Sequence, residues 1–226
     1  MIAEIYKKDT TGEDQLTGDM FGVLRYLPFQ SGIKPILQNS VYPAQLLNCL
    51  DDILLNEWSQ TIHFWGERRY DNTEPDVVIE LADTVILIEV KLDSGLGKQQ
   101  LKRESKLLIK HYPHCSKKIL VVLAREISSS NIYEQYQNSI PNTISFGYIT
   151  WQKVFAALNN IHLSDPYQAL VIEDLLKLLK RKGFESFREF KKYDFDISPF
   201  CYWEFREDFY FTDSNVIGED LYYVFK

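Results

Sequence analysis

The spacing of apolar residues predicts helices in several parts of the chain. Apolar side chains recur at a helical period within residues 13–27, and this stripe ends before Pro28. A second helical pattern covers residues 43–58, after a loop at 30–41. A glycine-containing turn precedes a basic amphipathic helix at 98–111. Further helices are expected at 129–138, 151–159 and 166–182, the last closed by Gly183.

Between these helices the pattern changes to that of β-strands. Runs of β-branched and aromatic residues predict strands at 61–70, 76–81 and 84–92. An almost wholly apolar run at 118–124 predicts a strand covered on both faces, and 143–149 predicts another. Only Ala82 and Asp83 separate the second strand from the third, which favours a tight hairpin. We therefore expect an α/β core with a helix, a three-stranded antiparallel meander, a helix and a further strand.

Composition indicates an ordinary globular protein, since 45% of the residues are hydrophobic and 25% are charged. The longest apolar runs fall far short of the roughly 20 residues of a membrane-spanning helix, so we expect no membrane partner. The first residues lack the basic and apolar blocks of a leader peptide, which favours a cytoplasmic protein. The three cysteines form no Cys-x-x-Cys pair, which argues against disulfides and structural zinc.

The net charge of −7 conceals a strongly basic segment. Eight basic residues and one acid, Glu104, lie between Gly97 and Arg125. Such a segment is often only a solvated helix face, so a phosphate-binding role needs independent support. By contrast, residues 184–226 are rich in aromatic residues and acidic overall, and we expect their rings to pack on the core or on a protein partner.

Candidate catalytic residues gather on the predicted hairpin. With a two-residue loop, Leu81 pairs with Thr84 and Asp76 lies directly opposite Glu89. Their Cβ atoms would then be roughly 5 Å apart, so both carboxylates could reach one divalent cation. Lys91 shares the face of Glu89 because side chains alternate along a strand. The alternative is an ordinary ion pair between Glu89 and Lys91 at a sheet edge.

The string Glu74-Pro75-Asp76, twelve intervening residues and then Glu89-Val90-Lys91 resembles the signature of the PD-(D/E)XK nuclease superfamily. The resemblance implies a restriction-endonuclease-like core over residues 1–160, with a C-terminal helix and an aromatic, acidic extension at 161–226. It also implies that Asp76, Glu89 and Val90 bind Mg²⁺, for which Mn²⁺ can substitute. Lys91 would serve the catalytic water.

Two accessory positions also match this family. A preceding helix often adds a glutamate, and Glu13 lies on the inward stripe of residues 13–27, although Asp14 is an alternative. Gln100 resembles a glutamine that follows the Glu-x-Lys strand in many members, with Gln99 as a fallback. The basic helix would then bring four cations beside the metal site, where a nucleic-acid backbone must pass. These residues are Lys98, Lys102, Arg103 and Lys106.

From these residues we expect a Mg²⁺-dependent nuclease that hydrolyses DNA, with restriction of foreign DNA favoured over repair by analogy alone. RNA stays open as a substrate. A homodimer is a further hypothesis, because cutting both strands of a duplex needs two sites. The competing interpretation is a catalytically inactive nuclease fold that binds a protein partner through its C-terminal extension.

Overall fold

The computed structural model describes residues 12–39, 60–71, 73–92, 94–125, 132, 135–136 and 139–185. By its internal contacts the chain divides into a unit of residues 1–186 and a unit of residues 187–226. All described residues belong to the first unit. The helix predicted at 43–58, most of the helix predicted at 129–138 and the aromatic segment after residue 185 lie outside the described residues.

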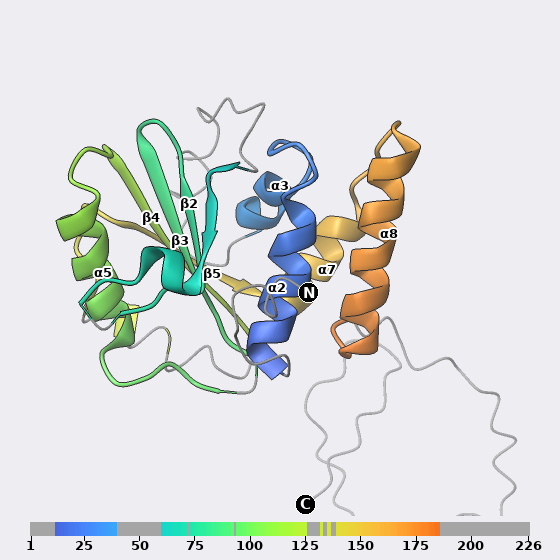
Figure 1. The fold of residues 1–226 in the computed structure, drawn as a ribbon. Coiled ribbons are helices and arrows are strands. Elements are labelled where there is room, and N and C mark those ends of the chain that lie inside the picture. Colours follow the sequence, from blue (N-terminus) through green and yellow to red (C-terminus); the bar gives the residue numbers. More distant parts are fainter. Residues whose placement is uncertain are drawn as a thin grey trace, which may run out of the picture. The chain divides into compact units, whose positions relative to one another are not determined.

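The first unit is an α/β structure built on one open, mixed sheet of five strands in the order β1-β2-β3-β4-β5. The strands are β1 (Ile62–Phe64), β2 (Val77–Glu80), β3 (Thr84–Val90), β4 (Lys117–Ala124) and β5 (Ser145–Thr150). The first three strands pair antiparallel, and β3, β4 and β5 pair parallel. The predicted succession of helix, antiparallel meander, helix and strand is therefore observed (Figure 1).

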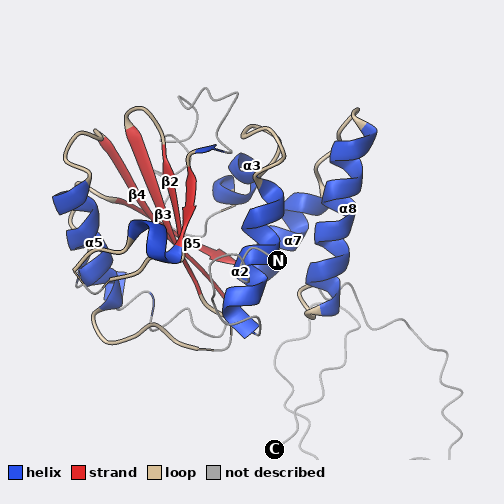
Figure 2. Ribbon diagram, viewed as in Figure 1, coloured by secondary structure: helices blue, strands red, loops and turns tan. Residues whose placement is uncertain are grey.

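Helices cover both faces of this sheet (Figure 2). On one side lies α5 (Gln100–His111), and its apolar stripe packs on strand residues such as Leu87 and Leu120. The other face, which includes Ile86 and Val121, packs against the remaining helices. These are α2 (Gly12–Leu24), α3 (Ile33–Gln38), α7 (Trp151–Asn159) and α8 (Pro166–Arg181). Coverage of both faces explains why β3 and β4 are almost wholly apolar.

Two predictions about local structure are wrong. The strand expected at 61–70 ends at Phe64, and the 3₁₀ helix η2 (Trp65–Arg68) follows it. The carboxylate of Glu67 accepts the Phe64 N–H at 3.2 Å, which closes this turn and competes with strand pairing. The loop expected at 30–41 contains the short helix α3, because Ile33, Ile36 and Leu37 are all buried in the core.

None of the helices among the described residues combines the length and apolar character needed to cross a bilayer. The N-termini of the last two helices follow the predicted chemistry. The Thr150 hydroxyl accepts the Lys153 N–H at 3.2 Å, and the Asp165 carboxylate caps α8, which has Pro166 in its first turn. These caps fix where α7 leaves β5 and where α8 begins.

Candidate active site

The β2–β3 hairpin has the register that the sequence predicts. The Leu81 N–H donates to the Thr84 carbonyl at 2.8 Å, and Val77 lies opposite Ile88. One step further, Asp76 therefore faces Glu89. Both carboxylates are buried, and Glu89 is only 3% exposed. The two acids are thus paired at the end of the sheet where β3 finishes.

Lys91 follows β3 and is held there through its backbone. Its N–H donates to the Leu123 carbonyl at 2.7 Å, and its own carbonyl accepts the buried Trp151 indole N–H at 3.0 Å. The Arg125 guanidinium donates to the Leu92 carbonyl at 3.0 Å. The partners are Leu123 in β4 and the residues that directly follow β4 and β5, so the carboxyl ends of the three parallel strands fix the position of Lys91. Clefts outside such strand ends are common ligand sites in open α/β sheets.

Glu13 enters the same site from α2. Its Oε1 accepts from the Lys91 ammonium at 3.1 Å, and its Oε2 accepts the Leu92 N–H and the Ser94 hydroxyl, each at 2.9 Å. Glu13 therefore bridges the helix to the end of β3. Leu16 and Met20, on the same face of α2, are fully buried, which is how the inward stripe orients Glu13.

Gln100 enters from the opposite layer, at the first turn of α5. Its Nε2 donates to Glu89 Oε1, and its Oε1 accepts the Gly97 N–H at 2.9 Å. The fallback residue Gln99 instead forms the N-terminal cap position of α5, with a left-handed φ of 55°. Gln100 thus connects the loop before α5 to the carboxylate of Glu89.

Glu104 also belongs to this site, and the sequence did not single it out. It lies one turn after Gln100 on α5, is 1% exposed, and contacts Glu89 and Gln100. Its Oε2 has no hydrogen-bond partner. The available signal was position: Leu101, Glu104 and Leu108 lie on one helical stripe, so this acid faces inward while the lysines around it face solvent.

We call the side chains gathered here the hairpin cluster. Its members are Glu13, Asp76, Glu89, Lys91, Gln100 and Glu104. Lys91 contacts both Glu13 and Glu89, the latter at 2.5 Å. The cluster therefore contains four carboxyl groups and one ammonium, which contacts two of them. The two helical layers contribute opposite sides of the cluster, and the hairpin supplies its centre.

The electrostatics reflect this excess of acids. Burial and the neighbouring Glu89 raise the pKa of Asp76 well above its usual range. Burial and Glu104 do the same to the pKa of Glu89, and burial raises the pKa of Glu104 to about 7. Burial opposes the charge of Lys91, but Glu89 and Asp76 outweigh it and raise the pKa of this ammonium. The lysine is consequently protonated at neutral pH.

Oxygen donors of this kind suit a hard cation such as Mg²⁺. Asp76 and Glu89 are the carboxylates that the predicted metal site requires. The Val90 side chain packs in the core on the opposite face, so only its backbone could contribute. As the side chains stand, no group of three acidic, histidine or cysteine residues in the described part of the chain is arranged to hold a metal ion. Three contacts engage the two carboxylates instead: Lys91 and Gln100 both contact Glu89 Oε1, and Asp76 accepts the Val90 N–H at 2.8 Å.

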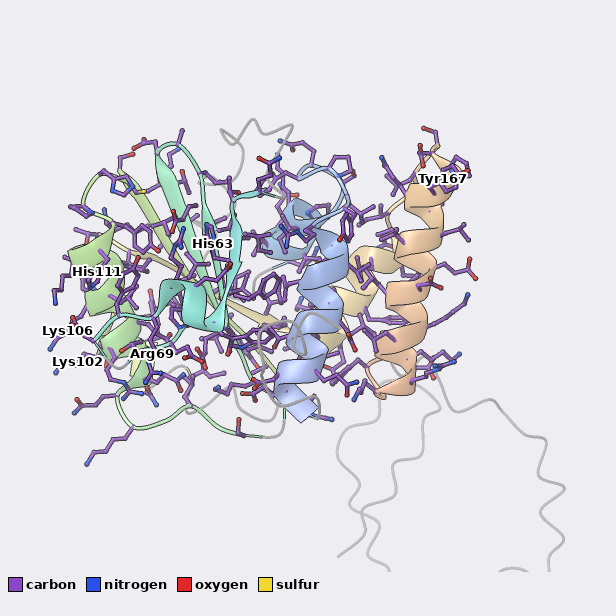
Figure 3. All side chains as sticks on the ribbon, in the orientation of Figure 1. His63, Arg69, Lys102, Lys106, His111 and Tyr167 are labelled. Atoms are coloured by element: carbon purple, nitrogen blue, oxygen red, sulfur yellow. The ribbon has the colours of Figure 1, made fainter. Side chains whose placement is uncertain are left out.

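The basic residues predicted to bind nucleic acid lie beside this cluster. Lys98, Lys102 and Lys106 are exposed, and among the described residues none of them forms an ion pair. Arg103 donates to the Lys98 carbonyl at 2.6 Å. Figure 3 shows Lys102 and Lys106 on the outer side of α5, directed away from the sheet. Lys102 and Lys106 are four residues apart on α5 and therefore follow one line along the helix, whereas Lys98 precedes the helix.

Lysines on α8 have a different environment. Lys177 pairs with Glu173 at 2.8 Å and with Asp174 at 3.5 Å, and Lys180 pairs with Glu185 at 3.1 Å. Each of these lysines has an acidic partner, whereas Lys102 and Lys106 on α5 form no ion pair within the part of the chain that the structure describes.

Comparisons with protein-family models, with curated proteins and with solved structures find no match to this chain.

Proposed function

We propose that this protein is a Mg²⁺-dependent deoxyribonuclease of the PD-(D/E)XK type, with a restriction-endonuclease-like core. One observation carries the proposal. Asp76, Glu89 and Lys91 meet at the end of the hairpin, and the two accessory residues expected from the resemblance, Glu13 and Gln100, reach the same point from different helices. An incidental ion pair on a sheet edge would not need these partners. It would also be exposed, whereas this group is buried.

Asp76, Glu89 and the Val90 backbone would hold the cation, and Mn²⁺ is expected to substitute for Mg²⁺. When bound, such an ion polarises phosphoryl oxygens and lowers the pKa of a coordinated water. The surplus of buried negative charge supports this assignment, because four carboxyl groups with one lysine are costly to ionise together. Glu89 would have to release part of its contact with Lys91 to take part.

Lys91 acts in this proposal as a cation and hydrogen-bond donor. Its raised pKa keeps the proton on Nζ, so it is not the group that removes a proton from water in the present arrangement. A fixed ammonium can orient the attacking water and neutralise charge that develops on the phosphate. Glu13 keeps the lysine in place, because it contacts Nζ and also fixes the backbone of Leu92.

DNA is the proposed substrate. Lys98, Lys102 and Lys106 are exposed cations before and along the helix that carries Gln100, and phosphate contacts supply most of the affinity of such surfaces. Arg103 lies among them. Cleavage of foreign DNA is the favoured biological role by analogy with the family alone.

The experiment is cleavage of linear and circular DNA, single- and double-stranded, with Mg²⁺, with Mn²⁺ and with chelator. The wild type should cut only with a metal, and Asp76→Asn and Lys91→Ala should not cut. RNA of matched length shows whether the activity is confined to DNA. If no form cuts any substrate and no metal binds at Asp76 and Glu89, the proposal is wrong and the inactive, partner-binding interpretation gains support.

A second arm tests the nucleic-acid surface. Lys102→Ala and Lys106→Ala should each weaken DNA binding, and the slope of log K against log salt should fall by about one for each lysine. Lys177→Ala is the matched control, because that lysine is paired on α8. Equal effects of the α5 and α8 substitutions on the slope would contradict the assignment of the surface.

A further inference from the structure

Glu104 has an unusual environment for an acid on a helix. It is the one acid in a segment with eight basic residues. Its side chain is buried against the sheet, with 1% of it exposed. Exposed lysines flank it at positions 102 and 106. A helix that needed only a core side chain here would carry an apolar residue, as at Leu101 and Leu108. The acid therefore needs an explanation beyond packing.

Its contacts are to two members of the proposed site. Glu104 contacts Glu89 and Gln100, and Gln100 itself donates to Glu89 Oε1. The three side chains form a closed set across the boundary between β3 and α5. A buried hydrogen bond of this kind fixes the rotamer of the group it touches, and partners of metal-binding carboxylates tune the binding of the ion in this way.

The remaining oxygen of Glu104 supports the same interpretation. Its Oε2 is buried and has no hydrogen-bond partner. Leaving such an atom unsatisfied is unfavourable, and a site that kept it only for stability would gain by replacing the acid. Structural roles are better served elsewhere on α5, where Leu107 and Leu108 fill the core.

We propose that Glu104 is a positioning residue that orients the Glu89 carboxylate for the cation. This inference rests on the proposed function, because it assumes that Glu89 binds a metal. Glu104 itself acts through Glu89 and Gln100. Without Glu104, Glu89 would be held by Gln100 and by the Lys91 ammonium alone, and both of these contact its Oε1.

The test is a calorimetric titration of the full-length protein with Mn²⁺. Glu104→Leu should weaken Mn²⁺ binding by about 10- to 100-fold. Glu104→Gln should bind close to the wild type, because an amide can donate to Glu89 and accept from Gln100. Thermal unfolding of each variant shows whether the fold persists. Ser105→Ala is the matched control, since Ser105 is equally buried in α5 but its hydroxyl makes no hydrogen bond.

The outcomes separate this inference from the proposed function. If the wild type does not bind Mn²⁺, or if Asp76→Asn binds as the wild type does, the metal site itself is wrong. If Asp76→Asn abolishes binding while Glu104→Leu binds normally, only the role of Glu104 is overturned. Equal losses in Glu104→Gln and Glu104→Leu would also overturn it, because charge rather than hydrogen bonding would then matter.

Discussion

Two polar clusters lie at opposite ends of strand β2 and differ in charge balance. The hairpin cluster begins at Asp76, and the second, which we call the Arg68 cluster, is built around Glu80, about 13 Å further along the strand. Arg68 Nε donates to Glu80 Oε1, and the Tyr112 hydroxyl donates to the same oxygen at 2.9 Å. The ring of His63, labelled in Figure 3, lies 3.0 Å from the Arg68 guanidinium.

The electrostatic outcome in the two clusters is opposite. Burial alone would raise the pKa of Glu80, but the hydrogen bonds from Arg68 and Tyr112 outweigh it and the pKa is lowered. In the hairpin cluster the pKa values of Asp76 and Glu89 are raised well above their usual range. In the Arg68 cluster the charge of Glu80 is compensated by Arg68. The hairpin cluster has more acids than its single lysine can compensate. An unbalanced buried cluster is a mark of function rather than of stability.

The largest expected contrast is between the two cations. Lys91→Met should lower the rate of DNA cleavage by about a factor of 10³, since it removes a fixed charge from the reacting phosphate. Arg68→Met should leave cleavage close to the wild type and lower the free energy of unfolding by about 1 to 2 kcal/mol, because Glu80 loses a charged partner while partly exposed. Single-turnover cleavage and urea unfolding measure the two effects. A large loss of cleavage in Arg68→Met would remove the distinction between the clusters.

The next contrast concerns stabilisation by the metal. Without divalent cations at pH 8, Asp76→Asn should raise the free energy of unfolding by about 1 kcal/mol, because it removes one of the buried acids while an amide oxygen still accepts the Val90 N–H. Saturating Mg²⁺, at about 100 times its Kd, should stabilise the wild type by about 2.7 kcal/mol and leave Asp76→Asn unchanged. Denaturant curves with Mg²⁺ and with chelator provide the measurement. Equal stabilisation of both forms would place the ion elsewhere.

The smallest contrast is in the pH dependence of stability without metal. Glu104 has a folded-state pKa of about 7 against an ordinary value of 4.5, so the folded state binds the extra proton. Its contribution to the free energy of unfolding is fully present below about pH 4.5 and is lost as the pH rises through about 7. The lowered pKa of Glu80 gives the reverse sign, with stability lost as the pH falls. Urea midpoints measured between pH 4 and 8 provide the test. Glu104→Gln should weaken the dependence of the midpoint on pH near neutrality, and Glu80→Gln should weaken it at acidic pH.

The sequence predicted the register of the β2–β3 hairpin correctly, because this geometry is local. A two-residue loop sets the hairpin register, and that register alone places Asp76 opposite Glu89. Helical periodicity favoured Glu13 over Asp14, and this pattern is also local in the sequence. The contact between Glu13 and Lys91, however, spans 78 positions, and only the resemblance suggested it.

Burial of polar groups was harder to predict. Glu104 looked like a minor acid in a basic helix, because composition does not reveal which face of α5 meets the sheet beside Glu89. The turn at Trp65–Arg68 was missed because the surrounding residues favour a strand. The hydrogen bond from the Phe64 N–H to the Glu67 carboxylate cannot be recognised from composition. Both depend on tertiary contacts, which override local propensity.

The most direct test of the account is a crystal structure of the protein with Mn²⁺, read from its anomalous difference map. We predict a peak between the Asp76 and Glu89 carboxylates, next to the Val90 backbone, and no comparable peak at the Arg68 cluster. A map without a peak at the hairpin, in which the Lys91 ammonium still contacts Glu89 and Glu13 at saturating Mn²⁺, would contradict the proposal of a metal-dependent nuclease.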